Sequence, residues 1–234
     1  VEQRLIQLRP DGPPVASVIL FAGGKGALNL SSFLGVPAIG WGENNFLVRT
    51  RGLFAEQGFL VAVVDAPSDR LSKKGMLGGF RNSAEHVQDI DAVIAYLREQ
   101  ADVPVWLVGT SRGTESAAHL AIHSTQNPAG LVLTSSMSER NAKGTALPDM
   151  ALSRVAIPTL IVAHDQDACP KTPPAGAHAI AGLLTAAPAV EVKLFSGGDR
   201  PRSKPCQAMS YHGFLGIEDE VVAAIAAFIK ANQN

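Results

Sequence analysis

The sequence predicts an α/β fold with a mostly parallel central sheet and helices on both faces. Short apolar runs rich in β-branched residues recur along the 234 residues, and segments with helical spacing of apolar residues lie between most of them. Most of these runs are apolar at every position, which is typical of parallel strands buried on both faces. The length suits one large α/β domain or two small ones, and we expect a single domain over residues 1–234.

The predicted strands are apolar runs bounded by glycine, proline or polar turns. The first alternates mildly between apolar and polar residues, which indicates an edge strand, and the later ones are continuously apolar. In chain order they cover residues 4–9, 16–22 and 59–65, the run that begins at Pro104, and residues 131–134, 157–163 and 190–195. Residues 29–45 are rich in glycine and serine, and their pattern favours no element.

The predicted helices carry apolar residues three and four positions apart. Gly58 is placed to end the first helix as a C-cap. Asn82 with Glu85 resembles a capping box at the start of the second helix. The helices cover residues 46–57, the segment whose apolar face holds Val87, Ile90, Val93, Ile94 and Leu97, the alanine-rich segment after Ser111, and residues 174–185 and 217–232.

Composition excludes several classes of partner. The net charge is −1, so nothing suggests a nucleic-acid surface. No apolar run reaches the roughly 18 residues of a membrane-spanning helix. The sequence contains no CxxC, HExxH or acidic calcium loop, so we expect neither a metal site nor a cofactor. The loop of residues 196–205 holds three basic residues, which favour a solvated loop over a site for an anionic substrate.

The stretch around Ser111 carries the clearest chemical motif. Gly109, Ser111 and Gly113 form a Gly-x-Ser-x-Gly pattern between a predicted strand and a predicted helix, which is the context of a nucleophile elbow. If the helix starts at Ser111, its free N–H groups face any oxyanion formed beside the serine. Residues 23–26 follow another buried strand, and their glycines suit the second half of an oxyanion hole better than an ordinary turn or a phosphate loop.

A serine hydroxyl needs a base to remove its proton, and the base needs a carboxylate to orient it. Four of the six histidines fall inside predicted helices and are expected to be packing or surface residues. His212 lies in the long loop after the last strand and is the predicted base, with His164 as the rival. Asp167 follows the strand of residues 157–163 and is the predicted acid, with Asp165 in reserve; both acids could instead solvate the loop or cap the next helix.

The order serine, acid, histidine is that of the α/β-hydrolases. The chain resembles this superfamily over nearly its whole length, from the strand that enters the glycine loop to the final helix. The resemblance implies hydrolysis of an ester or related acyl bond through an acyl-Ser111, with Asp167 and His212 completing the set. It also implies that the backbone N–H groups of Arg112 and Gly24 stabilise the oxyanion.

The chain departs from many relatives in three places. Phe21-Ala22-Gly23 stands where they have His-Gly, which leaves the second oxyanion donor open. His164 stands where many have glycine, which leaves Asp165 and Asp167 as alternatives. Residues 135–154 are too short for the helical lid that many relatives insert, so we expect an open site and no large cap domain.

The two cysteines fit the same map. Cys169 follows the acid and Cys206 precedes the histidine, in loops that should cross the same end of neighbouring strands. A disulfide between them is predicted over two free thiols. It would favour a periplasmic or secreted protein over a cytoplasmic one, and the start at Val1 is compatible with a processed or trimmed N-terminus.

These patterns together predict a lidless serine hydrolase of the carboxylesterase type that acts on a small or exposed acyl substrate. Other reactions on the same fold remain open, namely peptide, thioester or lactone hydrolysis and haloperoxidation. A binding protein that kept the fold without activity is the alternative from another class. The complete set of Ser111, Asp167 and His212 argues against that alternative.

Overall fold

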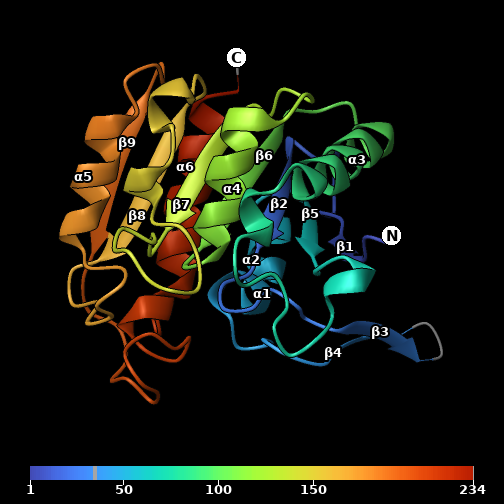
Figure 1. The fold of residues 1–234 in the computed structure, drawn as a ribbon. Coiled ribbons are helices and arrows are strands. Elements are labelled where there is room, and N and C mark those ends of the chain that lie inside the picture. The colour runs from blue at the N-terminus through green and yellow to red at the C-terminus, as the bar shows by residue number, and fades with distance from the viewer. Residues whose placement is uncertain (34–35, 234) are drawn as a thin grey trace.

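The computed structural model describes residues 1–33 and 36–233, and its central element is a seven-stranded sheet (Figure 1). The order across the sheet is β1-β5-β2-β6-β7-β8-β9. The strands are β1 (Leu5–Leu8), β2 (Ala16–Phe21), β5 (Phe59–Val64), β6 (Val105–Thr110), β7 (Gly130–Thr134), β8 (Thr159–His164) and β9 (Val190–Phe195). Strand β1 lies at the edge of the sheet, as its alternating sequence predicted, and it alone among the seven strands runs antiparallel, on β5. The predicted mostly parallel sheet is confirmed.

Helices cover both faces of the sheet, and each face has its own apolar core. On one face lie α3 (Ala84–Gln100), α4 (Gly113–His123) and α5 (Ala175–Leu183). On the other lie α1 (Phe46–Arg49), α2 (Arg51–Glu56) and α6 (Glu218–Ala231). The central strands β2, β5, β6, β7 and β8 are buried at every residue, because side chains on both of their faces meet helices (Figure 1).

The segment that the sequence left unassigned holds a small antiparallel hairpin. Its strands are β3 (Leu30–Phe33) and β4 (Val36–Ile39), paired with Leu30 opposite Ile39. The hairpin stands outside the main sheet (Figure 1). It leads into Trp41 and the start of α1, which border the pocket described below.

Three predicted helix boundaries are wrong by short distances. The helix expected over residues 46–57 is divided into α1 and α2 at Thr50, whose hydroxyl donates to the carbonyl of Phe46 at 2.7 Å. The cap of α3 is Ser83 rather than Asn82, and it accepts from the N–H of His86. The helix after the elbow begins at Gly113 rather than at Ser111.

The connection between β7 and β8 has no α-helix among its residues, all of which the structure describes. It contains two 3₁₀ turns, η3 (Leu147–Asp149) and η4 (Leu152–Arg154). Two further turns, η1 (Ser68–Arg70) and η2 (Phe80–Asn82), interrupt the polar loop before α3, and η5 (Tyr211–Gly213) precedes α6. The expectation of a fold without a large cap domain is therefore confirmed.

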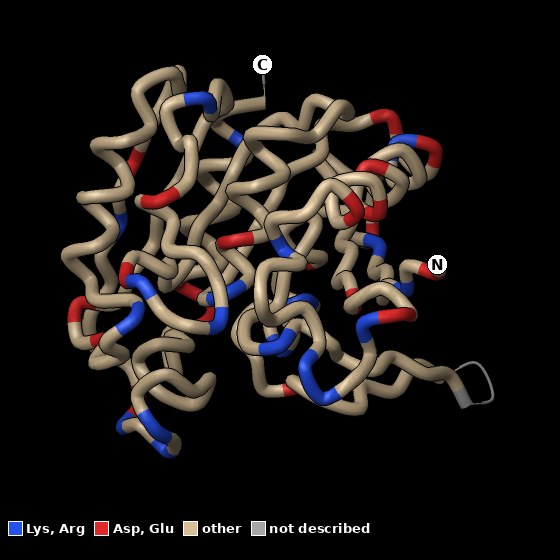
Figure 2. The backbone as a smooth tube through the Cα atoms, in the orientation of Figure 1, with Lys and Arg blue, Asp and Glu red and all other residues tan. Residues whose placement is uncertain are grey.

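Charges of both signs are scattered over the molecule, and basic residues gather at the tip of the loop that follows β9 (Figure 2). These are Arg200, Arg202 and Lys204, all exposed, and Arg202 pairs with Asp199 at 2.9 Å. Within residues 1–33 and 36–233, no helix has the length and apolar character needed to cross a membrane. The same residues contain no cluster of histidine, cysteine and acidic side chains suited to a metal ion.

Candidate active site

Ser111 lies in a sharp turn between β6 and α4. Its φ is 52°, in the left-handed region that a residue with a Cβ rarely occupies, and its N–H donates to the carbonyl of Thr134 at 3.0 Å. The turn needs glycine on both sides. A Cβ on Gly109 would lie 2.5 Å from the carbonyl oxygen of Gly113, and one on Gly113 would overlap the carbonyl of Phe21. The strand, turn and helix that a nucleophile elbow requires are all present.

Asp167 and His212 come from the loops after β8 and β9 and meet at the same end of the sheet. Asp167 Oδ2 lies 2.9 Å from His212 Nδ1, and both residues are 5% exposed. The other oxygen of Asp167 accepts from the N–H of Cys169 at 2.9 Å. The carbonyl of His212 accepts from the hydroxyl of Ser135 at 2.8 Å. Asp167 and His212 are therefore both buried, and each accepts a further hydrogen bond that fixes its position.

Thr172 adds a third member to this pair, and sequence reasoning missed it. Its hydroxyl donates to Asp167 Oδ2 at 2.9 Å and lies 3.0 Å from His212 Nδ1. Thr172 is 2% exposed. It lies five residues after Asp167, in a loop whose course no local sequence pattern fixes. The hydroxyl restricts the carboxylate to one orientation toward the imidazole.

The two rival residues point elsewhere. The side chain of Asp165 is 46% exposed and lies 3.3 Å from Nδ1 of His164. His164 is fully buried, with Nδ1 accepting from the N–H of Gln166 and Nε2 donating to the carbonyl of Gly197 at 2.9 Å. Its ring stacks on Tyr211. Both ring nitrogens of His164 are engaged, so its role is to hold the loop after β9.

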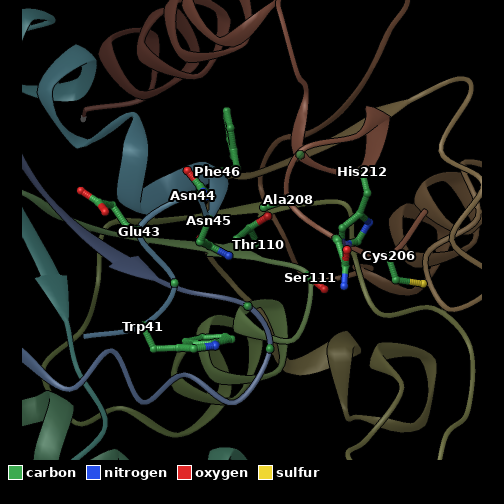
Figure 3. Close-up of a pocket in the computed structure, with 15 residues that line it drawn as sticks. Trp41, Glu43, Asn44, Asn45, Phe46, Thr110, Ser111, Cys206, Ala208 and His212 are labelled. Atoms are coloured by element: carbon green, nitrogen blue, oxygen red, sulfur yellow. The ribbon is translucent and has the colours of Figure 1, made fainter. Parts of the chain in front are cut away.

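Ser111 and His212 line one pocket of about 260 Å³ (Figure 3). The hydrogen bonds of the described residues include none between these two side chains. One wall of the pocket comes from the glycine loop and the segment from Trp41 to Phe46. The opposite wall comes from Cys206, Gln207 and Ala208. The three basic residues of the loop after β9 do not line it.

Gly24 lines the pocket and Arg112 directly follows Ser111. Across residues 1–33 and 36–233, no hydrogen bond involves the backbone N–H of either. Gly24 has φ +59°, and a Cβ there would lie 2.6 Å from the ring of Trp41. Two unpartnered N–H groups beside a serine are what an oxyanion hole needs.

Arg81 is a buried side chain that supports the glycine loop. Its guanidinium donates to the carbonyl of Ala22 at 2.9 Å and to the hydroxyl of Ser116 at 2.8 Å, and the residue is 1% exposed. Burial lowers the pKa of Arg81 from 12.5 to about 10, against the opposing effect of the carboxylate of Glu115. Arg81 is therefore a buried cation at neutral pH. No pattern in the sequence singles out this arginine.

Glu115 and Arg112 form a second buried charged group beneath the elbow. Arg112 Nη1 lies 3.2 Å from Glu115 Oε1, and Arg112 also donates to Asn141. Burial raises the pKa of Glu115, and the charge of Arg81 opposes that shift most strongly. Glu115 also accepts from the N–H of Thr145 at 3.1 Å. These contacts attach the β7–β8 connection to the first turn of α4.

Cys169 and Cys206 form the predicted disulfide, with their Cα atoms 4.7 Å apart. Cys169 is buried, whereas Cys206 is exposed and lines the pocket. The bond joins the loop that carries Asp167 to the loop that carries His212. It fixes the two loops to each other within a few residues of both side chains.

A family model described as "Serine aminopeptidase, S33" matches residues 49–174, more than half of the chain. No curated protein matches the sequence.

Several solved structures share the fold at low identity. MenH from S. aureus is 14% identical, with a TM-score of 0.64 over 98% of this chain and 99% of that one. A monoacylglycerol lipase from Paleococcus ferrophilus is also 14% identical, with a TM-score of 0.63 over 99% and 100%. A thermostable carboxyl esterase from Bacillus coagulans is 15% identical, with a TM-score of 0.64 over 99% and 94%. By its fold and by the family model, the chain belongs to the S33 serine aminopeptidase family of α/β-hydrolases.

Proposed function

We propose that the protein is a serine hydrolase that cleaves a carboxylic ester or related acyl bond through an acyl-Ser111 intermediate. One observation carries the proposal: the buried Asp167–His212 pair opens onto the same pocket as Ser111, which stands in a left-handed turn. In this proposal residues 1–234 act as one domain, and no cofactor takes part.

The steps follow from the positions of these groups. Ser111 Oγ attacks the acyl carbon while His212 Nε2 takes the serine proton, and Asp167 stabilises the resulting imidazolium through Nδ1–H. The N–H groups of Arg112 and Gly24 receive the charge that develops on the acyl oxygen. The tetrahedral intermediate expels the alcohol, which takes the proton from His212. Water then attacks the acyl-serine by the same route and releases the acid.

The pocket supports a small or exposed acyl group. Its volume of about 260 Å³ is just below the range of roughly 300–1,000 Å³ for sites that enclose drug-sized ligands. The β7–β8 connection carries no cap that would bury a long acyl chain.

A second candidate is hydrolysis of a peptide bond next to a free amino terminus. The family model is described as a serine aminopeptidase, which favours a substrate with a free amino group beside the cleaved bond. The chemistry at Ser111 would be the same, and the leaving group would be an amine. Aryl esters and aminoacyl arylamides offered to the same preparation would separate the two candidates.

The test that needs no choice of substrate is labelling with a fluorophosphonate, followed by mapping of the labelled residue by mass spectrometry. We expect one label at Ser111, none in Ser111→Ala, and strongly reduced labelling in His212→Ala. His178→Ala, which removes an exposed histidine of α5, is the matched control and should label like the wild type. Folded wild-type protein that takes no label would contradict the proposal and favour a binding protein on this fold.

The disulfide supports a location outside the reducing cytoplasm, so we propose a periplasmic or secreted protein. Thiol titration of protein isolated without reductant, under denaturing conditions, should find no free thiol. Two free thiols would support the cytoplasmic alternative.

A further inference from the structure

Asn45 occupies a capping position without acting as a cap. Asparagine at a helix N-cap normally accepts from a backbone N–H two or three residues later. Asn45 precedes α1, yet its side chain makes no capping hydrogen bond. Its Oδ1 is buried without a partner. A buried acceptor without a partner costs free energy, so the amide of Asn45 does not stabilise the fold.

The amide lies beside Ser111. An ideal Cβ built on Gly23 would be 3.0 Å from Ser111 Cβ and 3.3 Å from Asn45 Nδ2, so both groups surround the same point of the glycine loop. Asn45 and Ser111 line the same pocket. Figure 3 shows the Asn45 amide extending from the start of α1 toward Ser111.

The backbone of Asn45 is fixed, although its side chain is free. Its N–H donates to the carbonyl of Gly42 at 2.8 Å, and its carbonyl accepts from the N–H groups of Val48 and Arg49. The next residue, Phe46, is 1% exposed and packs on Phe214. The fixed backbone keeps the amide at the pocket, and the amide makes no capping hydrogen bond that a substrate oxygen would have to displace.

We propose that Asn45 is a catalytic residue whose Nδ2 donates a hydrogen bond to the acyl oxygen of the substrate, as a third donor beside the N–H groups of Arg112 and Gly24. The inference rests on the proposed acyl transfer to Ser111. Neither the nucleophile elbow nor the glycine loop predicts this residue, because it belongs to a different segment. Its contribution is realised as negative charge forms on the oxygen, so it acts on kcat more than on KM.

The test compares Asn45→Ala and Asn45→Asp with the wild type in hydrolysis of 4-nitrophenyl acetate, with active sites counted by fluorophosphonate labelling at Ser111. Removal of one oxyanion donor lowers kcat about 100-fold, and we expect this for Asn45→Ala with KM little changed. Asn45→Asp keeps the shape but replaces the donor with a negative charge, so its kcat should be lower still. Because no hydrogen bond of the fold is lost, the Tm of Asn45→Ala should match the wild type.

Asn232→Ala is the matched control. The Asn232 amide donates to the carbonyl of Phe228 at 2.9 Å at the end of α6, and the residue does not line the pocket. Its removal should lower Tm and leave kcat unchanged, the reverse of the pattern for Asn45→Ala. A wild-type kcat in Asn45→Ala whose Ser111 still labels, or a loss of Tm without a loss of kcat, would overturn the inference alone. An unlabelled wild type would overturn the proposed function as well.

Discussion

The two walls of the pocket are held in different ways. We use histidine wall for the loops of residues 165–172 and 196–213, which carry one side of the pocket, and glycine wall for residues 23–26 and 41–46, which carry the other; only part of each lines the pocket itself. In the histidine wall, Asp167, Thr172 and His212 bond to one another, and a disulfide joins the two loops. In the glycine wall, the loop rests on one buried cation, Arg81, and several polar groups in and behind it have no partner.

Other buried polar atoms without a partner lie elsewhere in the described residues, such as Ser138 Oγ beside Lys171, but four lie in or behind the glycine wall. These four are Asn45 Oδ1 in the wall itself, and Arg81 Nε and both ring nitrogens of His86 behind it. A wall that orients a charged pair gains from saturated hydrogen bonding, because each bond restricts the carboxylate and the imidazole. A wall that receives charge from a substrate must keep its donors free, and that freedom costs stability. The contrast leads to three predictions.

The largest effect on stability should come from the disulfide. The cross-link joins residues 37 positions apart, and the chain-entropy model gives about 4 kcal/mol for a loop of that length. Replacing both cysteines with alanine should lower the free energy of unfolding by that amount, measured by urea denaturation. Fluorophosphonate labelling of Ser111 should also become slower, because the loops of Asp167 and His212 lose their link.

Reduced wild-type protein is the control for the cysteine variants, since it lacks the bond but keeps both side chains. It should unfold at the same urea concentration as the double variant. A double variant as stable as the oxidised wild type would mean that hydrogen bonds alone hold the histidine wall.

The stability of the protein and the position of the glycine loop should depend on Arg81. Arg81→Met keeps an unbranched side chain but leaves the carbonyl of Ala22 and the hydroxyl of Ser116 without their donor. We expect a loss of about 3 kcal/mol in the free energy of unfolding, because buried groups lose their charged partner. Labelling of Ser111 should slow as well, because the loop that carries Gly24 is no longer held.

Arg98→Met is the matched control for Arg81→Met. The only side-chain hydrogen bond of Arg98 within the described residues is an exposed one to the carbonyl of Asn127, so its loss should change stability by less than about 0.5 kcal/mol. Equal stability of the two variants would show that Arg81 does not hold the loop.

The two walls also differ in how far the sequence predicted them. The histidine wall could be predicted because parallel strands end at one edge of the sheet, so residues that follow β8 and β9 must come close to one another. That rule located the disulfide and both loops. It did not choose between Asp165 and Asp167, because only the path of the backbone turns one acid inward and leaves the other exposed.

The glycine wall was harder to predict because it is formed by segments that are distant in the sequence. The hairpin of β3 and β4 was missed because its strands have four residues each and β4 is largely exposed, so no apolar periodicity marks it. The helix over residues 46–57 was predicted as continuous because apolar spacing does not record the Thr50 hydroxyl that interrupts it. No local sequence pattern marks Arg81 or Asn45, because the glycine loop that they approach is distant from both in the sequence.

The smallest predicted effect depends on pH and concerns His86, behind the glycine wall. Burial lowers the pKa of His86 from 6.5 to about 3, and the nearby charge of Arg81 contributes to the shift. The folded protein therefore keeps His86 neutral while the unfolded chain takes up a proton below pH 6.5. The stability contribution is present above pH 6.5 and is lost as the pH falls toward 3.

His86→Phe removes this proton uptake and keeps an aromatic ring between Phe21 and Phe80. Urea denaturation at two pH values should compare the free energy of unfolding of the variant with that of the wild type. The difference in favour of the variant should be about 2 kcal/mol larger at pH 5 than at pH 7.5. His178→Ala removes an exposed histidine and should show no such difference. A gain for His86→Phe that does not change with pH would mean that the imidazole has the same pKa in the folded and unfolded states, so that burial behind the glycine wall does not lower it.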